Sequence, residues 1–189
     1  MVEPGRVIEF PDDVSEVLAT PATTGDRYRV IGTTPPGGGI GIKGFGRHLH
    51  PGLIEIFRCV SGTMTVRVGK ELVDLAPGGV AEVPAGTVHG FVNTGIEPLV
   101  AEVDLIFTPP GPRPEADLIR FAIILDGLIR DGHVNKRSGY PPLSQQALLL
   151  RRRFPEAMNQ PGIGKQIMAV LAVFGHLRRL RTDFTEYES

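Results

Sequence analysis

Three histidines and one glutamate constrain this chain more than any other feature. A single residue separates His48 from His50, Glu55 follows shortly after, and His89 lies about forty residues beyond the pair. Side chains two residues apart on a β-strand point to the same face, so His48 and His50 can face one interior. Imidazole and carboxylate together suit iron, manganese, nickel, copper or zinc. The sequence therefore predicts a site for one divalent transition-metal ion, bound by these four side chains inside a β-structure.

Glycines and prolines stand at fixed distances from these four residues. Six residues separate Glu55 from Gly62, and the second stretch reads Gly78-x5-Pro84-x-Gly86-x2-His89-x3-Asn93. This arrangement resembles the cupin superfamily, whose two motifs are G-x5-H-x-H-x(3,4)-E-x6-G and G-x5-P-x-G-x2-H-x3-N. One position departs from the pattern, because the first glycine of motif one falls at Ile42, with Gly41 and Gly44 nearby. The resemblance covers about residues 25–107 and implies a jelly-roll β-barrel with the metal inside.

Short apolar runs alternate with turn residues along the first 107 residues. Turn signals such as Ser61-Gly62 and Pro77-Gly78-Gly79 separate these runs. The expected strands are 6–10, 28–33, 40–45, 53–60, 63–68, 71–75, 80–83, 88–92 and 99–107. Many short strands at this spacing are typical of a sandwich or barrel. Together with the resemblance, they predict an all-β jelly-roll (cupin) barrel.

The periodicity changes after a segment that holds four prolines in seven residues, 108–114. Proline interrupts both strands and helices, so this segment reads as a linker. Beyond it, apolar residues recur at helical spacing over 116–130, 143–153 and 163–180. We therefore expect a barrel at 1–107 with motifs at 41–62 and 78–93, a Pro-rich linker at 108–114, and an α-helical extension at 115–189. The extension should pack on the barrel or on a dimer partner.

Composition excludes several classes of protein. The net charge of −1 gives no reason to expect a nucleic-acid partner, and the single cysteine, Cys59, allows no disulfide within the chain. The first 30 residues carry no secretory signal, so a cytoplasmic location is expected. The apolar helix at 163–180 is shorter than the roughly 20 residues of a transmembrane span. Its apolar surface and the frequent dimers of cupins predict a homodimer, with membrane-surface contact as the alternative.

Strand parity indicates what surrounds the metal. If Glu55 points inward, then Leu53, Phe57 and Cys59 share its face, and Phe91 and Asn93 accompany His89. This mostly apolar lining favours an apolar or aromatic small molecule. We expect a metal-dependent enzyme, performing either dioxygenase-like oxidation or Lewis-acid isomerisation or cyclisation. A non-catalytic protein that binds or senses a small molecule remains the alternative, because the sequence identifies neither the metal nor the substrate. A general base beside the metal would favour the enzyme over the binding protein. The candidates are Glu82, Glu102 and Asp104, and the sequence does not show whether their side chains point into the barrel.

The remaining conspicuous residues favour structural roles. The G-x-G-x-x-G pattern at 39–44 leads into His-x-His and not into a helix, so it does not indicate dinucleotide binding. His133 and His176 read as a loop and a helix residue, and Cys59 as core filler. The run Arg151-Arg152-Arg153 favours a solvated face or an interface over an anion site.

Overall fold

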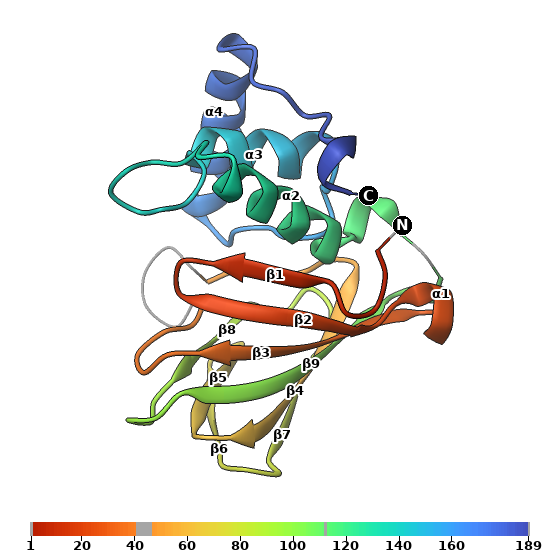
Figure 1. Ribbon diagram of the computed structural model, residues 1–189, viewed down its shortest axis with the longest axis vertical. Helices are drawn as coiled ribbons and strands as arrows, with labels where there is room; N and C mark the ends of the chain where they lie inside the picture. Colours follow the sequence, from red (N-terminus) through yellow and green to blue (C-terminus); the bar gives the residue numbers. More distant parts are fainter. Residues whose placement is uncertain (1, 41–46, 112, 189) are drawn as a thin grey trace.

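The first part of the chain forms two facing β-sheets. The computed structural model describes residues 2–40, 47–111 and 113–188. Within them, the strands are β1 (Val7–Phe10), β2 (Asp13–Ala19), β3 (Arg27–Thr34), β4 (Leu53–Ser61), β5 (Met64–Val68), β6 (Glu71–Leu75), β7 (Val80–Val83), β8 (His89–Asn93) and β9 (Leu99–Phe107). One sheet has the order β1-β2-β3-β9-β4-β7 and the other β6-β5-β8, with antiparallel pairing throughout. The predicted all-β barrel is confirmed (Figure 1).

Strand β4 carries the alternation that builds the interior. Leu53, Glu55, Phe57 and Cys59 are buried, while the residues between them are half-exposed. The inward side chains of β4 meet those of β5, β6, β7 and β9 in an apolar cluster that fills the barrel. Its buried members are Phe57, Cys59, Met64, Val66, Leu75, Ala81, Val83, Leu99 and Ala101. Glu55 therefore stands on the face that packs against this cluster.

The rest of the chain forms a helical layer beside the large sheet. A short helix, α1 (Pro21–Thr24), precedes β3, and the layer itself contains α2 (Leu118–Arg130), α3 (Leu143–Arg152) and α4 (Ile163–Leu177), with 3₁₀ turns at Pro114–Ala116 and Thr185–Tyr187. Figure 1 shows α2 running along β1, between the sheet and the other helices. Asp117 caps α2 by accepting a hydrogen bond from the backbone of Arg120 at 2.9 Å.

Helix α2 joins the two halves because it buries two faces. Ile119 and Ile123 pack into a cluster with Tyr28, Leu53 and Phe107 of the barrel. The opposite face of α2 packs with the helical layer, in a cluster of Phe121, Ile124, Leu125, Leu128, Leu149, Leu150, Phe154, Ala157 and Phe184. Burial of apolar area at roughly 25 cal/mol per Å² makes both faces stabilising. The extension is thus part of the folded core of this chain.

Helix α4 leaves one apolar face uncovered. Ile163, Val170, Val173, Phe174 and Leu177 are each at least half exposed, whereas Gly164, Ala172 and Gly175 are buried. Gly175 lies so close to α3 that an added Cβ would stand 2.6 Å from the carbonyl oxygen of Ser144. Among the described residues, no helix is long and apolar enough to cross a membrane.

Most of the expected strands and helices differ from the structure by one to three residues at an end, and one strand was not expected. Strand β2 pairs with both β1 and β3, although only Val17 of its side chains is buried. Helix α4 ends at Leu177, before the expected 180, because Arg179 adopts a positive φ of 53° that α-helices do not allow. The expected strand at 40–45, together with Gly41, Ile42 and Gly44, lies almost wholly outside the described residues.

Candidate metal centre

The segment before β4 brings two of the histidines to the third. His48 and His89 form an antiparallel bridge, in which the His89 amide donates to the His48 carbonyl at 2.8 Å. Leu49, between the two histidines, faces the other way and exchanges two backbone hydrogen bonds with Asn159 at 2.8 and 2.9 Å. The Gly86 amide donates to the carbonyl of His50 at 2.9 Å. Backbone hydrogen bonds to His89, Asn159 and Gly86 therefore hold the segment 48–50 in an extended conformation, with both histidines on one face.

The four predicted ligands meet in one buried place. His48, His50 and His89 each offer a ligand atom within 4.8 Å of the other two. One oxygen of Glu55 lies 3.2 Å from Nε2 of His50, and the other lies 2.9 Å from Nε2 of His89. The exposed fraction of each of the four residues is 6% or less. Such a group is costly to bury without a cation or protons to balance it.

Backbone carbonyls orient two of the imidazoles. Nδ1 of His89 lies 2.8 Å from the carbonyl oxygen of Thr87, and Nδ1 of His50 contacts the carbonyl oxygen of Ala157. A carbonyl only accepts hydrogen bonds, so each Nδ1 must carry the proton and each Nε2 presents its lone pair to the site. Metal-bound histidines are commonly held in this way by a partner of the second ring nitrogen. The Ala157 contact was not expected, since a backbone carbonyl leaves no mark in the sequence.

The inward-facing atoms of the site fit a metal ion. Nε2 of His50, Nε2 of His89 and one carboxylate oxygen of Glu55 are buried without a hydrogen bond of acceptable geometry. Buried polar atoms are normally satisfied, so three unsatisfied atoms aimed at one another indicate a missing partner. Imidazole nitrogen and carboxylate oxygen are suitable donors for a divalent transition metal. The identity of the metal does not follow from this donor set.

Electrostatics also favour a charged Glu55. Burial would raise the pKa of this carboxyl group, but the imidazoles of His50 and His89 outweigh burial and hold the pKa well below its ordinary value. For His89, burial lowers the pKa, while the nearby Glu55 carboxylate raises it more, so the net direction is upward. The carboxylate therefore brings a negative charge to the centre of the cluster.

Comparison with known proteins identifies the barrel. Residues 30–108, from β3 to the end of β9, match the cupin domain family. These residues form a cupin domain. No curated protein matches the chain in sequence. The predicted membership of the cupin superfamily is confirmed for the barrel, which carries the buried cluster of three histidines.

Solved structures with a similar barrel come from several bacteria. The protein TT1209 from Thermus thermophilus is 29% identical, with a TM-score of 0.38, over 43% of this chain and 73% of its own length. KdgF from a Halomonas species is 23% identical, with a TM-score of 0.44, over 53% of this chain and 86% of its own length. A predicted oxalate decarboxylase from Thermotoga maritima is 23% identical, with a TM-score of 0.45, over 50% and 80%.

Two aromatic rings accompany the histidines inside the cupin domain. Phe57 is buried and Phe91 is half-buried, and their ring centroids lie 5.7 Å apart. Both pack with the interior cluster, as the parity argument requires. Cys59 belongs to the same cluster, and burial raises the pKa of its thiol, which keeps it in the unreactive protonated form.

The other two expected pocket residues, Leu53 and Asn93, contact parts of the fold outside the interior cluster. Leu53 packs toward α2, in the cluster that joins the cupin domain to the helices. The side-chain amide of Asn93 donates to the carbonyl oxygens of Thr34 and Glu97 at 2.9 and 2.8 Å, and its oxygen accepts from the amide of Gly95. The hydrogen-bonding groups of Asn93 are therefore engaged with the backbone around the turn that follows β8.

The three candidate bases lie on the outer face of the large sheet. Ile56 pairs with Glu82 on one side and Asp104 on the other, and Arg58 pairs with Glu102, so all three acids share the face opposite Glu55. Asp104 is fully buried there beneath Arg29 and Arg58, at 2.7 and 2.9 Å. Burial raises its pKa, but these guanidinium groups outweigh burial and lower it. None of the three therefore faces the cluster of Glu55 and the histidines.

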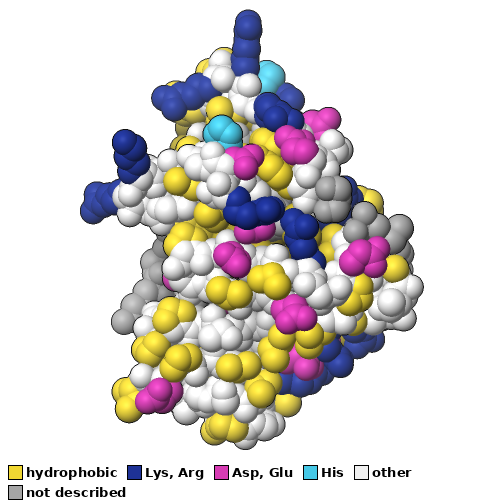
Figure 2. All heavy atoms as spheres, viewed as in Figure 1, with side chains coloured by type: hydrophobic (Ala, Val, Ile, Leu, Met, Phe, Trp, Pro, Cys, Tyr) yellow, Lys and Arg dark blue, Asp and Glu magenta, His cyan; other side chains and the backbone are white. Residues whose placement is uncertain are grey.

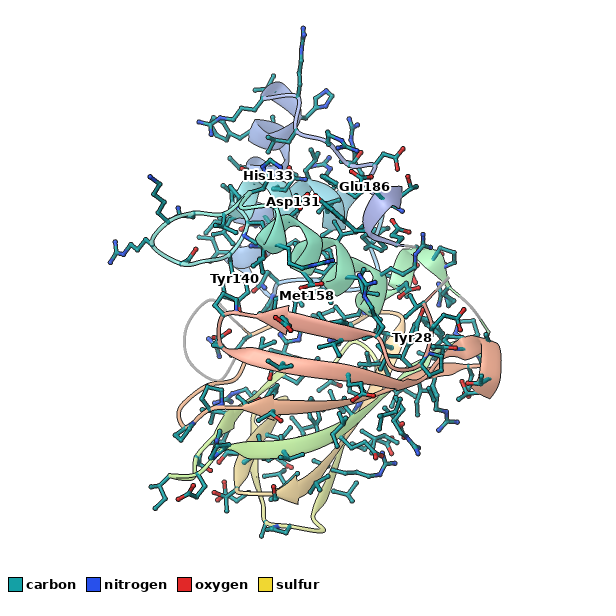
Figure 3. All side chains as sticks on the ribbon, in the orientation of Figure 1. Tyr28, Asp131, His133, Tyr140, Met158 and Glu186 are labelled. Atoms are coloured by element: carbon teal, nitrogen blue, oxygen red, sulfur yellow. The ribbon has the colours of Figure 1, made fainter. Side chains whose placement is uncertain are left out.

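His133, His176 and the arginine run 151–153 lie in the helical part of the chain. His133 lies in the turn after α2, away from the barrel (Figure 3), and His176 on α4 contacts Arg152 at 2.9 Å. Arg153 forms an ion pair with Glu188 at 2.7 Å. Figure 2 shows lysine and arginine side chains projecting from this layer. The arginine run is thus divided between different neighbours and does not form one cluster.

Proposed function

We propose that this chain binds one divalent transition-metal ion through His48, His50, Glu55 and His89 and acts as a metal-dependent enzyme on an apolar or aromatic small molecule. The observation that carries the proposal is the convergence of two buried, unsatisfied Nε2 atoms on Glu55. When bound, the ion supplies a Lewis acid for an oxygen donor of the substrate and, if it is redox-active, reactivity toward dioxygen.

The apolar interior supports a particular kind of chemistry. Phe57 and Phe91 pack on each other in the interior, two residues along their strands from Glu55 and His89, and would exclude water from a bound substrate. In the part of the chain that the structure describes, the candidate bases Glu82, Glu102 and Asp104 face away from the site. Reactions that need a separate side-chain base are therefore disfavoured. Dioxygenase-like oxidation fits best, and Lewis-acid isomerisation or cyclisation is the second reaction class.

The alternative is a protein that binds or senses a small molecule through the metal without converting it. The same observation supports it, because a site that none of the three candidate bases faces is sufficient for binding. Fold alone does not separate the two functions.

Metal analysis and oxygen uptake test the proposal in sequence. Elemental analysis of the purified protein should give one transition-metal ion per chain, with His50→Ala depleted and His133→Ala unchanged. Oxygen consumption with phenolic and diketone substrates should then scale with metal content. Metal-loaded protein that binds such compounds without consuming oxygen or converting them supports the binding protein instead. A wild-type protein without stoichiometric metal after loading contradicts both.

We also propose that the chain forms a homodimer through α4. Five large apolar side chains on one face of this helix are at least half exposed, and the opposite face packs on α3. Exposed apolar patches of this kind mark interaction surfaces. A second copy offers an identical apolar face, which makes a two-fold contact self-complementary. The alternative is that the same apolar face of α4 contacts a membrane surface.

A further inference from the structure

A cavity lies in the helical extension. It has a volume of about 240 Å³, is partly open to solvent, and is lined by α3, α4 and residues 155–160 of the loop between them. We refer to it as the extension pocket. Its lining residues are Ala147, Leu150, Arg151, Pro155, Met158, Asn159, Gln160, Lys165, Met168 and Ala169. Figure 3 labels Met158 in this region. The exposed apolar face of α4 is not part of this lining, so the extension pocket and the proposed dimer surface are separate.

The lining combines apolar side chains with positive charge. Leu150, Met158 and Met168 supply a flexible apolar wall, and methionine adapts readily to ligands of irregular shape. Arg151 and Lys165 contribute two cations, and the lining contains no aspartate or glutamate. The two neighbouring arginines differ, since Arg152 contacts His176 and Arg153 pairs with Glu188. In the described residues, neither Arg151 nor Lys165 forms an ion pair.

The volume limits the size of a ligand. A water molecule occupies about 30 Å³ of liquid, so the cavity corresponds to roughly eight waters, or a ligand with about eight non-hydrogen atoms. Small-molecule sites are mostly apolar with a few polar groups that fix orientation. A wall of aliphatic and thioether groups beside two cations is complementary to a short apolar chain that ends in an anion.

We propose that the extension pocket binds a short aliphatic monocarboxylate of about six carbons. The chain of the ligand lies along Leu150, Met158 and Met168, and its carboxylate lies between Arg151 and Lys165. Guanidinium and ammonium groups form strong, charge-assisted hydrogen bonds with carboxylates. This site is distinct from the metal centre and does not depend on the function proposed above.

Methionine-methyl NMR of the metal-loaded protein, titrated with hexanoate, tests the site directly. The sequence contains four methionines: Met158 and Met168 line the extension pocket, while Met64 is buried inside the barrel. We expect saturable shifts of the Met158 and Met168 signals, with an unchanged Met64 signal. A dissociation constant of about 0.1–1 mM is reasonable for eight non-hydrogen atoms.

Two comparisons separate this site from unspecific binding. The double variant Arg151→Ala/Lys165→Ala should bind hexanoate at least about tenfold more weakly, since it loses both charge-assisted contacts. The neighbouring variant Arg152→Ala should bind like wild type, because Arg152 is outside the lining. Hexan-1-ol, a neutral molecule of similar length, should also bind at least about tenfold more weakly than hexanoate. Shifts that do not saturate, equal affinity for the alcohol, or movement of Met64 alone would overturn the proposal.

Discussion

Nδ1 of His50 donates a hydrogen bond to the backbone carbonyl of Ala157, which lies 107 residues further along the chain. The same loop pairs with Leu49 through Asn159 on the neighbouring side of the histidine segment. A cupin-domain histidine thus takes its ring orientation from the helical extension. Positioning of this kind is expected to influence metal affinity, because the second nitrogen of a metal-binding histidine sets the direction of the first.

Weakening the anchor of this loop should therefore reduce metal affinity. Phe154 is 1% exposed, and its carbonyl accepts a hydrogen bond from the amide of Ala157 at 3.1 Å. We expect Phe154→Leu to weaken metal binding by about 10-fold, the lower limit of the effect of removing a positioning contact. Competition with a chelator measures it. Phe184→Leu is the matched control, since Phe184 belongs to the same cluster but not to the loop. Equal affinities in the two variants would show that the loop does not position His50.

Substitution of Phe91 should separate ligand binding from metal binding. Phe91→Ala removes a ring that packs on Phe57 in the barrel interior, without removing a proposed ligand. We expect full metal content, measured by elemental analysis, and at least about fivefold weaker binding or turnover of aromatic substrates, since such ring contacts are worth about 1 kcal/mol. Phe10→Ala, on a strand outside the interior cluster, should leave both quantities unchanged. Unaltered substrate affinity in Phe91→Ala would remove this ring from the binding site.

Charges on the outer face of α4 should dissociate the proposed dimer. Sedimentation equilibrium of the wild type should give twice the chain mass of 20.4 kDa at micromolar concentration. Phe174→Glu/Leu177→Glu should give the mass of a single chain, because a charge buried at an apolar interface is strongly destabilising. Leu72→Glu, at an exposed position on β6, serves as control and should remain dimeric. A wild type that sediments as a single chain would contradict the proposal.

Stability should depend on pH through Asp117. Burial raises the pKa of this carboxyl group from 3.8 to about 6, against the opposing hydrogen bonds from Arg120 and Tyr28. A raised pKa means that the folded state binds the proton more tightly, so this contribution to stability is complete below about pH 4 and is lost as the pH rises through 6. Denaturant unfolding of the wild type and of Asp117→Asn measures it. The free energy of unfolding of the wild type, relative to the variant, should fall by about 1–3 kcal/mol between pH 4 and 7. A constant or rising difference would contradict this.

Local sequence predicted the cupin barrel well because its strands are short, alternating and separated by glycine and proline turns. The bounds of β6, β7 and β9 agree with the expected runs, and the three long helices were placed within a few residues. Strand β2 was missed because only Val17 is buried, so tertiary pairing and not periodicity holds it in the sheet. The start of α2 was placed two residues early, since Asp117 caps the helix after a separate 3₁₀ turn.

The sequence predicted which side chains belong to the candidate site, but not the backbone contacts that orient them. Fixed spacing identified the four polar residues, and parity placed Phe57 and Phe91 beside them. The direction of Glu102 and Asp104 could not be read, because β9 is buried at residues of both parities. The contact of Ala157 could not be predicted, because every residue has a backbone carbonyl. Only the packing of the extension decides which carbonyl lies next to Nδ1 of His50.

The order of synthesis determines when the contact between His50 and Ala157 can form. Ala157 follows His89 by 68 residues, so the three histidines and Glu55 leave the ribosome well before the carbonyl that fixes the ring of His50. At about 5–20 residues per second, the interval is roughly 3–14 s. During that time Nδ1 of His50 lacks the carbonyl partner that it has in the finished chain, whereas His89 already has Thr87. The orientation of the His50 ring is therefore completed last, when the helical extension folds against the barrel.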